Sequence, residues 1–101
     1  MGLLEAIFGK KVDYKALMEQ GAIIVDVRTK PEFQSGHVAK SINVPLDQIK
    51  KRAAELKKKN KPLILCCASG MRSGSATNIL KAEGIECYNG GSWGKVQRSI
   101  S

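Results

Sequence analysis

The sequence predicts a single α/β domain with a mostly parallel central sheet and helices on both faces, and three observations support this. Strand-like and helix-like segments alternate from Asp13 to the end of the chain, which is the pattern of parallel-sheet α/β domains. The runs Ala22–Val27 and Pro62–Cys66 are almost continuously apolar, as in strands that are buried on both faces. The chain has 101 residues, enough for one hydrophobic core and too few for two.

Residues 1–11 are expected to be a short N-terminal extension of the domain that spans residues 1–101. Leu3, Leu4, Ile7 and Phe8 would share one side of an amphipathic element that packs onto the domain. The apolar run is interrupted and lacks both a basic lead and a small-residue cleavage site, which argues against a secretory signal. No stretch approaches the ~20 apolar residues that span a bilayer, so we expect no membrane partner.

The other elements follow from apolar spacing and from turn residues. An apolar run bounded by Gly or Pro predicts a strand, and apolar residues three and four apart predict a helix. Leu46, Ile49, Ala53 and Leu56 form one such helical stripe,. In chain order we expect a helix at 13–21 that Asp13 caps, a strand at 22–27, a helical turn from Pro31, a strand at 41–44, a helix from 46 that Asn60 closes, a strand at 62–66, a helix at 73–84, a strand at 85–88 and a final turn at 93–100.

The net charge of +8 is concentrated in one segment. Lys50–Lys61, called the basic segment below, holds seven basic residues and one acidic residue. We interpret it as the solvated face of a helix, with a docking surface for an acidic partner as the alternative. No aromatic residue lies between the lysines, which argues against binding of single-stranded nucleic acid, and no nucleic-acid partner is expected.

Three cysteines, Cys66, Cys67 and Cys87, form a poor disulfide framework, because the number is odd and two of them are adjacent,. The paired spacing of a zinc site is absent and the chain has one His, so no metal is expected. Reduced thiols indicate a reducing compartment such as the cytoplasm.

The segment after Leu65 carries the predicted chemistry, because ligand sites of such sheets lie beyond the carboxyl ends of the strands. Here a thiol ends a buried strand and is followed by a tight loop, Arg72 and a helix start. Loop amides, the helix start and the guanidinium all favour an anion at the loop centre. The Cys67 thiolate is the first such anion, so we expect its pKa well below ~8.5 and assign it as the nucleophile. Strand alternation sends Cys66 to the opposite side, as a buried strand-end residue.

Several motifs together resemble the rhodanese-like domains, which are single-domain sulfurtransferases, over about residues 12–96. They are Asp26-Val-Arg28, Pro31-Glu-Phe33, Gly36-His-Val38, Ser41–Pro45, the loop Cys67–Ser73, and Tyr88–Gly91 with Trp93. The resemblance implies that Cys67 accepts sulfur as a persulfide, which the backbone N–H groups of Ala68, Ser69, Gly70, Met71 and Arg72 hold. It also implies that Asp26 and Arg28 support the loop. Lys40-Ser41 departs from the Gly-Ala that the family usually has.

The implied activity is transfer of a sulfane sulfur from a small anionic, thiosulfate-type donor to a thiol or to cyanide, with no metal or organic cofactor. A persulfide carrier for a protein partner, docked on the basic segment, is the alternative. A third hypothesis starts the loop at Cys66, which gives the seven-residue loop of related phosphatases and arsenate reductases. The six-residue loop from Cys67 to Arg72 is favoured, because Leu65 rather than His precedes Cys66.

The remaining polar and aromatic candidates are assigned structural roles. Ser73 is expected to cap the helix start and so to support the loop. We expect a structural hydrogen bond at His37, packing at Trp93, and Glu32 as a cap or a pairing partner near the loop that carries His37. Cys87 is interpreted as a core residue, with a resolving thiol as the alternative.

Overall fold

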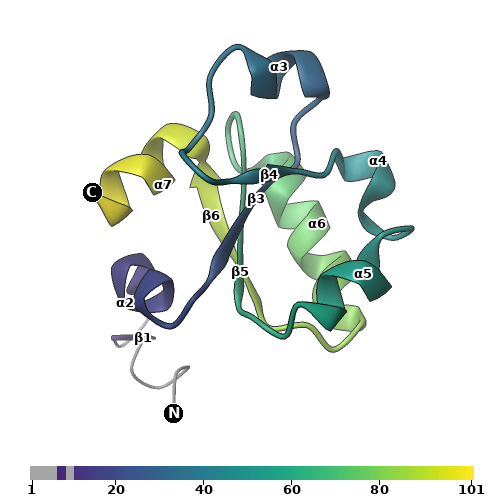
Figure 1. Ribbon diagram of the computed structural model, residues 1–101, viewed down its shortest axis with the longest axis horizontal. Coiled ribbons are helices and arrows are strands. Elements are labelled where there is room, and N and C mark those ends of the chain that lie inside the picture. The colour runs from purple at the N-terminus through teal and green to yellow at the C-terminus, as the bar shows by residue number, and fades with distance from the viewer. Residues whose placement is uncertain (1–6, 9–10) are drawn as a thin grey trace.

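A four-stranded, fully parallel sheet forms the centre of the computed structural model, which describes residues 7–8 and 11–101 (Figure 1). Its strands lie in the order β4-β3-β5-β6. They span Ile23–Asp26 (β3), Ile42–Asn43 (β4), Leu63–Cys67 (β5) and Cys87–Ser92 (β6). The sheet therefore confirms the predicted parallel architecture, and it brings the ends of β3 and β5 side by side.

Helices connect the strands and cover both faces of the sheet, as expected for an α/β domain. They span Tyr14–Glu19 (α2), Lys30–Gln34 (α3), Leu46–Ile49 (α4), Ala53–Lys58 (α5), Met71–Ala82 (α6) and Trp93–Ile100 (α7). In Figure 1, α2 and α7 lie on one side of β5, whereas α4, α5 and α6 lie on the other. The predicted N-cap of α2 is confirmed, because the Asp13 carboxylate accepts a hydrogen bond from the Ala16 amide at 3.0 Å.

Strand alternation divides the core into two apolar clusters, one on each face. On β5, Leu63, Leu65 and Cys67 enter the cluster under α4–α6. Ile64 and Cys66 enter the cluster under α2 and α7. All five side chains are fully buried. Adjacent residues of a strand point to opposite faces, so the predicted separation of the two neighbouring cysteines is confirmed.

The single helix expected after Pro45 is wrong, because the structure breaks it at residues 50–52. Arg52 has φ −99° and ψ 10°, and the Ala53 amide reaches back three residues to the Lys50 carbonyl at 3.3 Å. The apolar stripe survives the break, since Ile49 and Leu56 remain buried. The turn thus divides the expected helix into two short helices, α4 and α5.

The C-terminal boundaries also differ from expectation. β6 continues through Asn89–Gly91, which the sequence presents as a turn. The pairing register with β5 shifts there, from Leu65 opposite Asn89 to Cys66 opposite Gly91, so Gly90 is the extra residue of a bulge,. The final segment is a full helix, α7, rather than a turn.

Two features lie at the start of the chain and in the loop before β4. Most of the expected amphipathic element at 1–11 lies outside the described residues. Ile7–Phe8 (β1) pairs antiparallel with Lys11–Val12 (β2). Lys40 adopts φ +68°, a left-handed conformation that favours glycine. Among the described residues, no helix has the length and apolar character needed to cross a bilayer.

Candidate active site

The loop after β5 turns sharply at Gly70, and this turn places the first amides of α6 over the end of the strand. Gly70 adopts φ 103° and directly precedes Met71, the first residue of α6. A Cβ atom at Gly70 would lie 3.2 Å from the Gly91 Cα atom. Glycine is therefore required for both the left-handed backbone and the close approach of β6.

The Cys67 sulfur lies inside this turn and accepts hydrogen bonds from its backbone. The Gly70 amide donates to Sγ at 2.9 Å, and the Ser73 amide donates at 3.4 Å. The Ser73 hydroxyl oxygen lies 3.5 Å from Sγ. Converging N–H groups at the start of a helix form a cradle for an anion, so the geometry matches a thiolate at this position.

The cradle determines the protonation of Cys67. Burial alone would raise the pKa of this thiol, but hydrogen bonds from the Ser73 hydroxyl and from the amides of Ser73, Gly70 and Ser69 lower the pKa below its ordinary value. Hydrogen bonds to the charged form of a group stabilise that form. Cys67 therefore has the electrostatic setting of a reactive cysteine.

The other two thiols lie in apolar surroundings. Burial, with the nearby Asp26 carboxylate, raises the pKa of Cys66 to about 12. Burial raises the pKa of Cys87 to about 11, and its Sγ lies 3.5 Å from the Thr77 carbonyl. Both are core residues, and the structure brings neither of these side chains into the cradle at Cys67.

The predicted loop residues differ in how far their side chains are exposed to solvent. Ala68 and Ser69 are exposed, and Met71 is 81% exposed. Ser73 is fully buried and does not cap the helix, because Gly70 occupies the N-cap position. The expected capping role of Ser73 is therefore wrong, since α6 begins two residues earlier than the sequence indicates. The hydroxyl instead faces Sγ, and substrate binding by residues 68–72 stays a prediction.

Asn89 links β6 to the loop, and the sequence analysis missed it. Its carboxamide oxygen accepts from the Ser73 hydroxyl at 2.6 Å, and its carboxamide nitrogen donates to the Gly70 carbonyl at 3.0 Å. The Tyr14 hydroxyl donates to the Asn89 carbonyl at 3.0 Å. An Asn before two glycines is a turn signal, so no local pattern marks its place beside the nucleophile.

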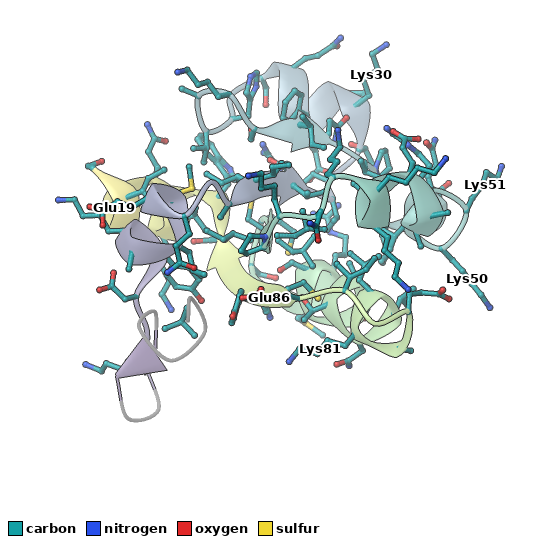
Figure 2. All side chains as sticks on the ribbon, turned by 60° about the horizontal axis from the view of Figure 1, so that its bottom comes forward. Glu19, Lys30, Lys50, Lys51, Lys81 and Glu86 are labelled. Carbon is teal, nitrogen blue, oxygen red and sulfur yellow. The ribbon has the colours of Figure 1, made fainter. Side chains whose placement is uncertain are left out.

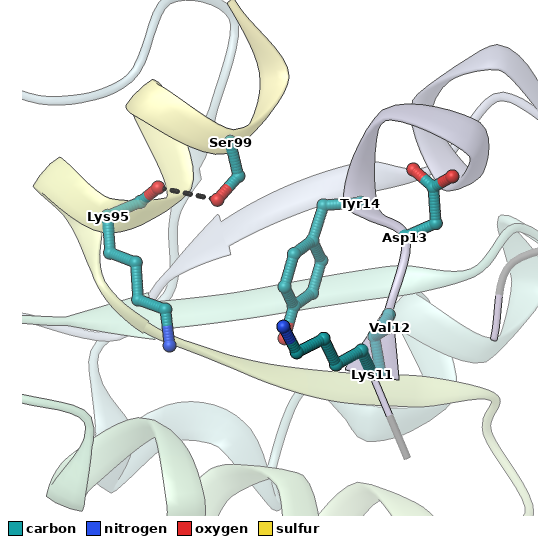
Figure 3. A pocket seen from close by; sticks show the side chains of 6 residues that line it. All are labelled: Lys11, Val12, Asp13, Tyr14, Lys95 and Ser99. Carbon is teal, nitrogen blue, oxygen red and sulfur yellow. Dashed lines mark hydrogen bonds between the residues drawn. The ribbon is translucent and has the colours of Figure 1, made fainter. Parts of the chain in front are cut away.

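A surface pocket of about 630 Å³ adjoins this link on the side of Tyr14 (Figure 3). Its walls come from β2, the start of α2 and the side of α7, with Lys11 and Lys95 among the lining residues. The Ser99 hydroxyl donates to the Lys95 carbonyl at 2.9 Å. Tyr14, which lines the pocket, therefore also contacts Asn89 through its hydroxyl.

Arg72 does not extend freely into the loop but pairs with α3. Its Nη1 and Nη2 atoms lie 2.8 Å and 3.1 Å from the two oxygens of Glu32. Glu32 also closes a capping box with Thr29 at the start of α3. The capping role expected of Glu32 near the His37 loop is confirmed, whereas its pairing with Arg72 at the start of α6 was not predicted.

Asp26 and Arg28 form a buried pair at the end of β3. Arg28 Nε and Nη2 donate to both carboxylate oxygens of Asp26 at 2.8–3.0 Å. Nη2 also donates to the Gly36 carbonyl at 2.6 Å, and the guanidinium lies 4.9 Å from the ring centre of Trp93. These contacts hold the loop after α3 and the start of α7, and direct support of residues 68–72 stays a prediction.

His37 and Trp93 have structural contacts, as expected. His37 Nδ1 lies 2.7 Å from the Phe33 carbonyl, and the two rings are stacked at 3.7 Å. Trp93 packs against the apolar cluster under α2 and α7. Across residues 7–8 and 11–101, no group of three or more His, Cys, Asp or Glu side chains could hold a metal ion.

Comparison with known proteins identifies the family. A model of the rhodanese-like domain matches residues 11–94. The putative sulfur carrier protein YrkF of Bacillus subtilis is 35% identical, over 82% of this chain and 42% of its own length. The thiosulfate sulfurtransferase GlpE of Pseudomonas syringae is 39% identical, over 70% of this chain and 66% of its own length. The chain spans about half the length of several curated relatives that it matches.

A solved structure agrees with these sequence matches. The E. coli rhodanese solved with anions superposes with a TM-score of 0.67 at 33% identity, over 73% of this chain and 89% of its own. The chain belongs to the family of rhodanese-like domains.

Proposed function

We propose that the chain transfers sulfane sulfur through a persulfide on Cys67. The observation that carries the proposal is the cradle at Sγ, where the amides of Gly70 and Ser73 point at the sulfur. These amides stabilise a thiolate before the reaction and an anionic persulfide after it. Free thiols at all three cysteines support a reducing compartment such as the cytoplasm,.

The reaction with a thiosulfate-type donor takes two displacement steps. In the first, the Cys67 thiolate attacks the outer sulfur of the donor, the new S–S bond forms, and sulfite leaves with the electron pair of the broken S–S bond. In the second, an acceptor thiolate or cyanide attacks the outer sulfur of the persulfide, and the Cys67 thiolate leaves. No proton donor is needed in either step, because every nucleophile and leaving group is an anion.

The carrier function is the second candidate, and two observations favour it. YrkF carries the name of a putative sulfur carrier protein. The basic segment also presents an unusually cationic surface: its lysines are exposed, whereas Arg52 is paired with Glu55 at 2.8 Å. Figure 2 shows Lys50 and Lys51 projecting away from the body of the domain. Such a surface is suited to an acidic protein partner.

Mass spectrometry of the whole chain after incubation with thiosulfate tests the proposal. We expect the gain of one sulfur atom, mapped to Cys67, in the parent chain and in the matched variants Cys66→Ser and Cys87→Ser. Cys67→Ser should gain none. A sulfur mapped to Cys66, or no gain at all, would overturn the proposal.

Turnover separates the enzyme from the carrier. If the chain is an enzyme for small molecules, thiocyanate should form from thiosulfate and cyanide as fast as the persulfide loads. If it is a carrier, the persulfide should load and then persist in cyanide, and it should discharge only to a protein acceptor.

A further inference from the structure

Glu32 and Arg72 form a two-point ion pair beside the nucleophile. The Nη1 and Nη2 atoms of Arg72 both donate hydrogen bonds to the Glu32 carboxylate, at 2.8 Å and 3.1 Å. The pair joins α3 to the first turn of α6, across 40 positions of sequence. Arg28, just beyond the end of the neighbouring strand β3, is compensated as well, because it is paired with the buried Asp26.

The pair changes the charge that an incoming molecule meets. Arg72 directly precedes Ser73, whose amide donates to the Cys67 Sγ atom, so the guanidinium charge acts on an anion held there. Hydrogen bonds from Arg72 and then from Thr29 lower the pKa of Glu32 to about 2, so its carboxylate is ionised throughout the neutral range. The cationic charge that the loop motif supplies is therefore matched by an anionic charge from α3, and the amide cradle remains the main attraction for an anion.

We propose that Glu32 determines the charge selectivity of the site. By compensating Arg72 it reduces the attraction for a second negative charge, so the site favours sulfane donors that carry one negative charge over dianionic thiosulfate. Organic thiosulfonates and organic persulfides belong to this singly charged class. The assignment of substrates rests on the proposed sulfur transfer, whereas the electrostatic effect at Cys67 does not.

The capping box allows the charge of Glu32 to be removed while the cap of α3 is kept. Gln is as suitable as Glu at this capping position, so Glu32→Gln removes the charge and keeps a partner for Thr29. Glu55→Gln is the matched control, because Glu55 is also an exposed carboxylate paired with an arginine at 2.8 Å. Both variants raise the net charge by one, and only the first does so beside Cys67.

The first measurement needs no sulfur transfer. Iodoacetate and iodoacetamide alkylate the same thiolate and differ by one negative charge, so the ratio of their rates at Cys67 reports the local potential. We expect Glu32→Gln to raise the iodoacetate-to-iodoacetamide ratio about three- to tenfold, the order expected for one partly solvent-exposed charge,, and Glu55→Gln to leave it unchanged. Arg72→Ala should lower the ratio, which keeps the test decisive if Glu32→Gln folds poorly.

The second measurement uses turnover. For the ratio of kcat/KM with thiosulfate to kcat/KM with benzenethiosulfonate, we expect the same about three- to tenfold rise in Glu32→Gln, carried mainly by the KM for thiosulfate. High salt should cancel most of the rise. An alkylation ratio that stays constant in Glu32→Gln and Arg72→Ala would overturn the inference, even where transfer proceeds. A shifted alkylation ratio without any sulfur transfer would instead refute the proposed function and leave the electrostatic role of Glu32 standing.

Discussion

Replacement of Ser73 by Ala tests how the cradle holds the Cys67 thiolate. The Ser73 hydroxyl oxygen lies 3.5 Å from Sγ and 2.6 Å from the carboxamide oxygen of Asn89. A hydroxyl has one proton to donate, so it cannot serve both acceptors at once. In the structure the hydroxyl donates to Asn89, and we expect it to donate to Sγ once Cys67 is a thiolate. Ser73→Ala removes this side-chain donor and leaves the backbone amides in place.

The expected size follows from the energy of a hydrogen bond to a charged group. Such a bond contributes about 1.5–3 kcal/mol, and one pKa unit corresponds to about 1.4 kcal/mol. The Sγ–Oγ distance of 3.5 Å is long and the hydroxyl has a competing acceptor, so the lower end applies. We expect Ser73→Ala to raise the pKa of Cys67 by about one unit.

Iodoacetamide alkylation across a pH series measures this pKa, because burial raises the pKa of Cys66 and Cys87 to about 12 and about 11 and keeps them slow. The control is Thr77→Val, which removes a buried hydroxyl one turn along α6 that donates to the Ser73 carbonyl rather than to Sγ. We expect its alkylation midpoint to match that of the parent chain. An unchanged midpoint in Ser73→Ala would refute a role for the hydroxyl in holding the thiolate.

The same pKa also makes stability depend on pH. Because the folded-state pKa of Cys67 is lowered, its contribution to the free energy of unfolding is complete above the unfolded-state pKa of ~8.5 and is lost as the pH falls through the folded-state pKa. Ser73→Ala should therefore lose about 1.4 kcal/mol more at alkaline pH than at acid pH. Urea unfolding at both ends of this range gives the comparison, and an equal loss at both would contradict it.

Three further substitutions test the packing around the site, each by urea unfolding. Gly90→Ala should lower the free energy of unfolding by about 1–3 kcal/mol, because its Cβ atom would lie 2.6 Å from a methyl carbon of Val96. The control Gly94→Ala should not destabilise the domain, because its Cβ atom meets only a flexible side chain. Equal effects of the two substitutions would contradict the packing of the bulge. Lys40→Gly should stabilise by about 0.5–1 kcal/mol, because φ is +68° there,, and a loss of stability would argue against that conformation. Asp26→Ala should lower the free energy of unfolding by about 3–5 kcal/mol, because it leaves the buried Arg28 guanidinium without its carboxylate,. A loss below about 1 kcal/mol would show that the pair is solvated.

Local patterns in the sequence determined the layout of the sheet and the position of the nucleophile. Apolar runs placed strands at β3 and β5, and the alternation along β5 separated Cys66 from Cys67. The spacing from Cys67 to Arg72 predicted the turn whose amides meet at Sγ. These features could be predicted because each depends on residues that are neighbours along the chain.

Other features were decided by the tertiary structure alone. Asn89 carries a turn signal, yet pairing with β5 draws it into β6 and places its carboxamide against Ser73. The stripe from Leu46 to Leu56 fits one helix, yet the sheet beneath it is covered by two. Arg72 has the sequence context of an anion-binding residue, yet its partner is Glu32, 40 positions away. Contacts of this kind depend on strand register and on the crossover that carries α3 past the end of β5, and no pattern among neighbouring residues contains that information.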